Sequence, residues 1–236
     1  GTPSFFELNS ATLPPHYRTA ARDAFWGLPR FHKWITIFPD QWRLSARLGR
    51  RLVVKEVNPF MLNWLIETVR PRIIYLLRHP VATASSFARM GWVGKQFEPR
   101  LTRQTLQNHV SDYPRFTHSF WAEHGALQAY ILSEVLRIAE TYDDLRLIQY
   151  EAICRDPLSA FRTLYDFAQL QWNDDIERNI RKRIAPDHPE TDDPYSVYRD
   201  SAKEAHKWKQ AVPAEQIKEV QEAWRAFHLP YYENDW

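Results

Sequence analysis

The sequence predicts an α/β fold in which helices flank a central, mostly parallel sheet in three layers. Short apolar runs alternate along the chain with amphipathic helix patterns, the order expected of parallel strands joined by helices. The run "RIIYLL" is continuously apolar, which is typical of a strand buried on both faces, and "LRLIQYE" is expected to be another buried strand. The 236 residues are 44% hydrophobic and 25% charged, enough to bury a core. No repeat or low-complexity linker divides them, so we expect a single domain over residues 1–236.

The elements are expected in the following order. Residues 1–50, rich in aromatics and proline, are expected to be irregular. Strands are expected where the short apolar runs lie, at Arg51–Val57 ("RLVVKEV"), Arg72–Leu77 ("RIIYLL") and Leu145–Glu151 ("LRLIQYE"). Helices are expected where apolar residues recur at helical spacing, over 60–70, from Pro80, over Ala126–Tyr142, from Asp156-Pro157, over 174–184 and over 213–227. The polar segment 91–120 is expected to be a variable insert.

Several function classes are disfavoured by composition. A net charge of +2 gives no general attraction to nucleic acid. No run reaches the roughly 18 apolar residues that a membrane span needs. The single cysteine, Cys154, allows no internal disulfide, and no Asn-x-Ser/Thr site occurs, which favours a reducing, cytoplasmic location. The nine histidines show no metal-ligand spacing, so no metal is expected.

Polar residues follow each predicted strand. Lys55-Glu56 come after "LVV", Arg78 after "IIYLL", and Tyr150-Glu151 after "LRLIQ". Ligands of open parallel sheets bind beyond the carboxyl ends of the strands. Arg78 would also lie at the N-terminus of the helix from Pro80, where free N–H groups and the helix dipole favour an anion. The pattern therefore indicates a phosphate site, because a guanidinium can bind two phosphate oxygens at once.

Serine hydroxyls at 85 and 86, about two turns into that helix, could donate to the same phosphate. The alternative is that Arg78 pairs with an internal carboxylate and the two serines only pack as small residues. The sequence pattern leaves both interpretations open.

The stretch "RHPVATASS" resembles the signature of the PAPS-dependent sulfotransferases, which share a P-loop NTPase-like α/β fold. In that family an Arg-x-Pro turn after a buried strand is followed, eight residues after the arginine, by a serine. Arg78 and Ser86 have this spacing. The resemblance implies that both hold the 3'-phosphate of 3'-phosphoadenosine-5'-phosphosulfate (PAPS), the sulfuryl donor.

Three further segments resemble the family in the same order. By the match of "VVKEVNP", Lys55 would lie near the transferred sulfuryl group. By the match of "IQYEAICRDPLSAFRTLYDFAQL", Tyr150 would contact the adenine. By the match of "YRDSAKEAHKWKQAVPAEQ", Arg199 and Ser201 would reach the nucleotide, and Trp208 would be the family's tryptophan before a helix. The resemblance covers roughly residues 50–90 and 120–227.

Two departures from the family pattern stand out. The family's N-terminal loop, a relative of the P-loop that cradles the 5'-phosphosulfate, has no counterpart, since none of the six glycines lies in such a motif. We therefore expect the sulfotransferase-like domain to be N-terminally incomplete. The second departure is the general base, because Val57 and Thr2 stand where members carry a histidine or a glutamate. Glu7 is our candidate, with Glu56 as an alternative.

The resemblance implies in-line transfer of a sulfuryl group from PAPS to a hydroxyl of a carbohydrate or small-molecule acceptor, with Lys55 stabilising the leaving oxygen and no metal. Two alternatives remain: an inactive, sulfotransferase-like nucleotide-binding protein, and a phosphotransferase of the P-loop kinase type. The aromatic cluster of Phe25, Trp26, Phe31, Trp34 and Trp42 could wall the acceptor pocket or form core. The basic run "RNIRKR" is expected to be a solvated helix face rather than a site for an acidic acceptor.

Overall fold

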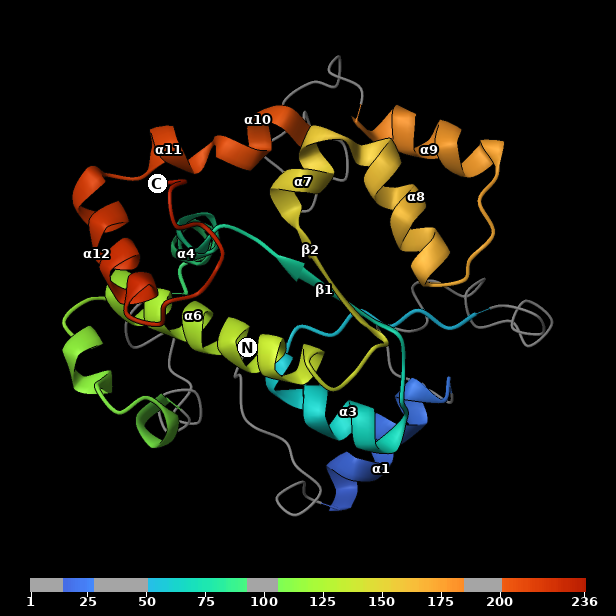
Figure 1. The fold of residues 1–236 in the computed structure, drawn as a ribbon, viewed down its shortest axis with the longest axis horizontal. Coiled ribbons are helices and arrows are strands. Elements are labelled where there is room, and N and C mark those ends of the chain that lie inside the picture. Colours follow the sequence, from blue (N-terminus) through green and yellow to red (C-terminus); the bar gives the residue numbers. More distant parts are fainter. Residues whose placement is uncertain (1–14, 28–50, 93–105, 185–200) are drawn as a thin grey trace. The chain divides into compact units, whose positions relative to one another are not determined.

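The computed structural model describes residues 15–27, 51–92, 106–184 and 201–236 (Figure 1). They fall into two compact units, one within Phe5–Pro71 and the other within Arg72–Trp236, and each is described by itself. The expectation of one domain over residues 1–236 stays a prediction, because one domain can contain two compact units.

The larger unit is a helix-rich α/β structure built on a small parallel sheet. Strands β1 (Ile73–Leu77) and β2 (Leu145–Gln149) pair in parallel, with Ile73 opposite Leu145 and Leu77 opposite Gln149. The helices of this unit are α4 (Pro80–Arg89), η4 (Tyr113–Phe116), α6 (Phe120–Ala139), α7 (Tyr150–Arg155), α8 (Pro157–Phe167), α9 (Asp174–Ile184), α10 (Ser201–His206), α11 (Trp208–Ala211) and α12 (Ala214–Arg225). The predicted strand–helix alternation is therefore confirmed for this unit.

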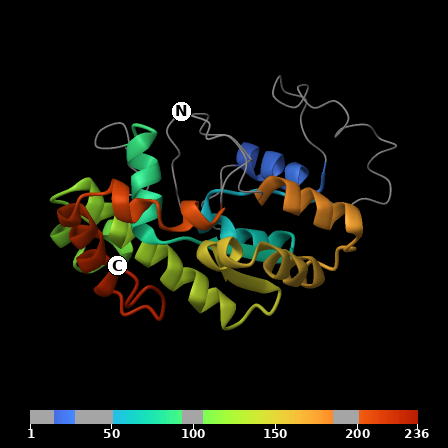
Figure 2. The ribbon, with the colours of Figure 1, turned by 90° about the horizontal axis from the view of Figure 1, so that it is seen from above.

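Helices α6 and α12 form the centre of the core, and both views show them side by side (Figures 1 and 2). Gly125 permits their close approach, because a Cβ at this position would lie 2.8 Å from the backbone oxygen of Val220. The inner face of β1 packs here too, with Leu77 buried in a cluster that includes Leu132 and Trp224.

The smaller unit contains α1 (Pro15–Phe25), η2 (Pro59–Met61) and α3 (Leu62–Thr68), with Trp64 of α3 buried against Phe25. The helix expected over 60–70 is thus confirmed. The expectation of irregular structure is wrong at Pro15–Phe25, which forms α1, a helix that begins with proline in its first turn.

Two strand predictions need correction. Arg51–Val57 forms no strand, and its apolar residues are exposed, with Val53 at 77%. One reason is local, since the Glu56 carboxylate accepts the backbone N–H groups of Val57 and Asn58 at 2.8 Å each. In β1 only one face is covered by the described residues, whereas Leu76 on the other face is 52% exposed. The two strands described here are too few to bury both faces.

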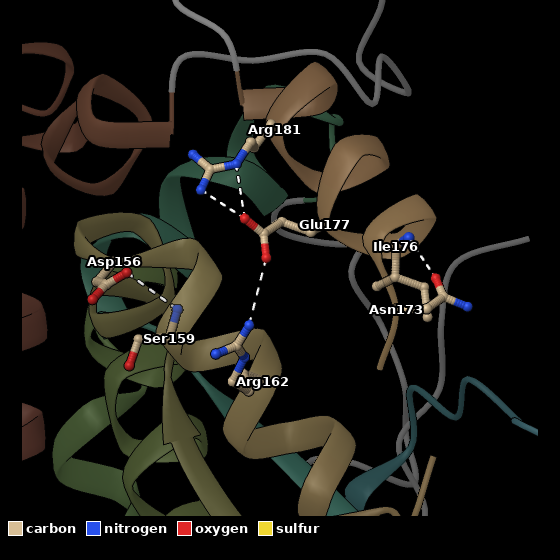
Figure 3. A network of polar contacts seen from close by, with 7 residues as sticks. All are labelled: Asp156, Ser159, Arg162, Asn173, Ile176, Glu177 and Arg181. Carbon is tan, nitrogen blue, oxygen red and sulfur yellow. Dashed lines mark hydrogen bonds and ion pairs between the residues drawn. The ribbon is translucent and has the colours of Figure 1, made fainter. Parts of the chain in front are cut away.

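A network of ion pairs on the surface joins α8 to α9 (Figure 3). Glu177 lies between Arg181, whose Nη2 is 2.7 Å away, and Arg162 at 3.5 Å. The pKa of Glu177 is lowered, mainly by its hydrogen bonds from Arg181. Helix α9 buries no residue, which supports the interpretation of its basic run as a solvated face. We call Arg162, Glu177 and Arg181 the surface network.

Candidate functional site

The candidate site lies where β1 and β2 end. Because Leu77 and Gln149 are paired in register, the next residues, Arg78 and Tyr150, leave the sheet at the same edge. The Arg78 guanidinium lies over the Tyr150 ring, with Cζ 4.6 Å from the ring centroid. The shared edge of the parallel strands thus brings together a cation and an aromatic face, as expected of strand tips in an open sheet.

Arg78 retains donors that the described residues do not use. Its Nε is buried and has no hydrogen-bond partner within the part of the chain that the structure describes. No described carboxylate forms an ion pair with Arg78, so the alternative of an internal salt bridge finds no support there. A buried donor without an acceptor is costly, which makes an anionic ligand the natural partner of this side chain.

Helix α4 begins next to Arg78, and its first turn differs from the expectation of several free N–H groups. His79 is the N-cap residue, and its Nδ1 accepts the N–H of Val81 at 3.3 Å. Pro80 has no N–H to offer. Two of the first donors are therefore unavailable to a ligand, and the electrostatic attraction of this helix end comes from its dipole and from Arg78.

His79 is fully buried, and its ring makes both aromatic and polar contacts. Its ring stacks on Trp208 with 4.1 Å between centroids, and its Nε2 lies 2.7 Å from the backbone oxygen of Asp235. Since that oxygen only accepts, Nε2 carries the proton and Nδ1 is the acceptor for Val81. Burial lowers the pKa of His79 to about 4, so the ring is neutral at pH 7.

Glu151 connects the two strand tips. Its Oε1 accepts the backbone N–H of His79 at 3.0 Å, and its Oε2 accepts the hydroxyl of Tyr232 at 2.7 Å. Burial raises the pKa of the Tyr232 phenol, and the hydrogen bond to Glu151 adds to this effect. We call His79, Glu151, Tyr232 and Asp235 the buried network.

The remaining residues predicted for the site are placed as follows. Ser86 lies in α4, in the same helix that follows Arg78. Ser201 is the first residue of α10, a helix that packs against α7 and thus near Tyr150 in the fold. Lys55 is exposed and belongs to the smaller unit, so the structure does not join it to Arg78. Glu7 and Arg199 lie outside the described residues.

Sequence reasoning missed the residues that hold the site in place. The tail of residues 229–236, "LPYYENDW", received no interpretation, although Tyr232 and Asp235 contact the residues that follow Arg78 and Tyr150. The density of aromatic residues in this tail was an available signal, since aromatic side chains this frequent usually pack against a core.

In the described ranges, no three His, Cys, Asp or Glu side chains gather in a way that could hold a metal ion. Helices long and apolar enough to cross a membrane do not occur in the same part of the chain.

Both strand tips lie within a stretch of the chain that matches a known family model. The family model described as the sulfotransferase family matches residues 18–174, which include β1, α4, β2 and α7. Among curated proteins and solved structures, no match to the chain was found.

Proposed function

Because the chain belongs to the sulfotransferase family, we propose that it transfers a sulfuryl group from PAPS to a hydroxyl of a carbohydrate or small-molecule acceptor. The observation that carries the choice of donor is Arg78. Its buried Nε finds no acceptor among the described residues, and its guanidinium already lies over an aromatic ring at the strand tips. An adenine nucleotide with a phosphate on its ribose would supply both an anion for Arg78 and a base for Tyr150.

The residues around Arg78 would each bind one part of this donor. Arg78 and Ser86 hold the 3'-phosphate, and Tyr150 contacts the adenine. Arg199 and Ser201 reach the nucleotide from the segment that leads into α10. These roles come from the family resemblance, and the placement of α10 against α7 supports the last of them.

The transfer itself needs two further groups. The bond between sulfur and the bridging phosphate oxygen breaks while a bond forms between sulfur and the acceptor oxygen. Lys55 stabilises the negative charge that develops on the bridging oxygen. Glu7 takes the proton of the acceptor hydroxyl. Glu56 is less suited to this role, because its Oε1 already accepts two backbone N–H groups.

The proposed donor also implies the finer architecture and location. We propose that the small parallel sheet of β1 and β2 is part of the three-layer, P-loop-like arrangement that such a donor needs. The strands pair in parallel although about 70 residues, which include α4 and α6, lie between them, and this is the connection type of that fold. Cys154 is the single cysteine of the sequence, so no internal disulfide can form, and this fits a cytoplasmic location.

Isothermal titration with 3'-phosphoadenosine 5'-phosphate tests the site. We expect Arg78→Ala to weaken binding by about 2 kcal/mol, roughly 30-fold, the loss expected for a charged hydrogen-bond partner. Arg89→Ala is the matched control, because it removes an exposed arginine from the other end of α4. An unchanged dissociation constant for Arg78→Ala would count against the site.

Two further assays separate the alternatives. A preference for ATP over 3'-phosphoadenosine 5'-phosphate in the same titration would replace the sulfotransferase by a kinase-type phosphotransferase. Tight binding of the nucleotide with no sulfate transfer to a panel of sugars, lipids and phenols would indicate a nucleotide-binding protein without catalysis.

A further inference from the structure

The tail of residues 229–236 holds the chain immediately beyond both ligand-facing residues. His79 follows Arg78, and Glu151 follows Tyr150. Glu151 joins the two tips to each other by accepting the His79 N–H. The second oxygen of this carboxylate is held by the Tyr232 hydroxyl, and the far nitrogen of the His79 ring by Asp235.

We propose that Tyr232 positions the nucleotide site, acting through the Glu151 carboxylate on the backbone that carries Arg78. This inference rests on the function proposed above. It assigns a role to a residue that lies 81 positions from Glu151 in the sequence and that touches no proposed ligand.

The Glu151 carboxylate is held at both of its oxygens. A carboxylate held at one oxygen can rotate about its terminal bond, because that torsion is broad and has no sharp minimum. The hydrogen bond from Tyr232 fixes the plane of the Glu151 carboxylate and thereby the direction in which Oε1 faces His79. The His79 backbone is one residue from Arg78, so the direction of the guanidinium depends on the same contact.

The tail is itself anchored by polar contacts to two helices. Trp224 Nε1 donates to the backbone oxygen of Tyr231 at 3.0 Å, and Lys209 pairs with the side chain of Asp235 at 2.8 Å. The Tyr232 ring packs edge-on against both His79 and Trp224. The tail is thus fixed to α11 and α12 and can serve as a rigid reference for the strand tips.

The backbone of Tyr232 has an unusual conformation. Tyr232 has a φ of 56°, in the left-handed region that bulky residues rarely adopt. Such a conformation persists only where surrounding contacts determine it, and it is found preferentially where structure serves function. Here the determining contacts are the hydrogen bond to Glu151 and the aromatic packing around the ring.

The test measures how well the site recognises the ribose phosphate. The readout is the ratio of the dissociation constants of adenosine 5'-phosphate and 3'-phosphoadenosine 5'-phosphate, measured by titration on the full chain. We expect Tyr232→Phe, which removes one oxygen, to lower this ratio roughly three- to tenfold, because a displaced guanidinium loses most of its contact with the phosphate. Tyr231→Phe removes the same atom from the neighbouring residue and should leave the ratio within about twofold.

A double-mutant cycle tests the route through Glu151. If Tyr232 acts through this carboxylate, Tyr232→Phe in a Glu151→Ala background should change the ratio by less than about twofold, whereas independent effects would multiply. Lys209→Ala loosens the same tail at an exposed ion pair and provides a milder variant. It should lower the ratio about twofold, since exposed pairs contribute little.

The outcomes are distinguishable. A lowered melting temperature of Tyr232→Phe with an unchanged ratio would show that the tail only stabilises the fold and would overturn the positioning role, provided that Arg78→Ala lowers the ratio. Should Arg78→Ala leave the ratio unchanged, the proposed nucleotide site itself fails and the positioning role with it. Multiplying effects in the double-mutant cycle would overturn the route through Glu151.

Discussion

The buried network at the strand tips and the surface network of α8 and α9 contain similar groups but differ in where their partners come from. In the surface network the partners of Glu177 are 4 and 15 residues away, and every arginine is exposed. In the buried network the partners of Glu151 are 72 and 81 residues away. The Glu177–Arg181 pair follows from helix geometry and the Arg162–Glu177 pair joins two successive helices, whereas the buried network forms only after distant parts of the chain have packed together.

The difference teaches which polar contacts matter for the site. Exposed ion pairs are weakened by water and salt, so the surface network in Figure 3 contributes little despite its good geometry. Removing one side chain of the buried network leaves its hydrogen-bond partner buried, where water cannot replace the lost contact. The expected loss of folding free energy is therefore large. Four experiments test this difference in stability between the two networks.

The largest effect is expected for the aromatic support of the buried network. Trp208 is 3% exposed and stacks on the His79 ring. We expect Trp208→Ala to lower the free energy of unfolding by about 4 kcal/mol, because it leaves a large cavity. Trp172, half-buried beside Arg162 near the surface network, is the comparison, and its replacement by alanine should cost less than half as much. Equal losses in urea unfolding would remove the contrast.

The next largest effect compares two glutamates directly. Glu151→Ala leaves the His79 N–H and the Tyr232 hydroxyl buried without their acceptor, for which we expect a loss of about 3 kcal/mol in unfolding free energy. Glu177→Ala removes the same side chain from the surface network and serves as the matched control. A loss for Glu151→Ala no greater than that of the control would contradict the importance of the buried network.

A third experiment uses pH. Burial lowers the pKa values of His79 and His124 to about 4 and about 3, so the unfolded chain takes up these protons first as pH falls. Stability is therefore lost below about pH 6.5, by about 2 kcal/mol per histidine between pH 7 and pH 5. The groups facing His79 are Asp235, Lys209 and His206.

The variant His79→Gln isolates one of the two histidines. Glutamine can donate to Asp235 and accept from Val81 as the neutral ring does, but it does not titrate. We expect its loss between pH 7 and pH 5 to be smaller than that of the unmodified chain by about 2 kcal/mol. The measurement is chemical denaturation at both pH values, and parallel losses in the two proteins would show that His79 is not buried as described.

The smallest effect concerns the surface network. Glu177→Ala should leave the melting temperature within about 2 °C of that of the unmodified chain at low salt, and closer still at 1 M salt, where such pairs are screened. Thermal unfolding at the two salt concentrations measures this shift. A larger shift that persists at 1 M salt would mean that the two networks are alike.

Much of the fold could be predicted from local patterns. The strands around Ile74 and Leu147 are confirmed, because their apolar runs are shorter than a typical helix and lie between polar or turn-forming residues. The start of α8 is confirmed at Pro157, where the Asp156 side chain accepts the N–H of Ser159 as an N-cap. The sequence also placed Arg78 and Tyr150 at two strand tips, which the structure brings together.

Other predictions failed where distant or competing contacts decide. The segment 51–57 has the composition of a strand, yet the Glu56 carboxylate binds its backbone and no strand pairs with it among the described residues. The strand predicted over Leu145–Glu151 included Tyr150, but β2 ends at Gln149 and Tyr150 begins α7. Strand composition indicates only suitability for pairing, because the partner strand lies elsewhere in the chain.

Local sequence patterns were enough to predict a cation and an aromatic residue at the strand tips, and a solvated face on α9. Both predictions depend only on neighbouring residues and on periodicity. Only the tertiary structure decided that Arg78 keeps an unused buried donor and that Tyr232 reaches Glu151. The physical reason is that burial and hydrogen bonds between residues 81 positions apart arise from packing of the whole unit, and no local pattern encodes them.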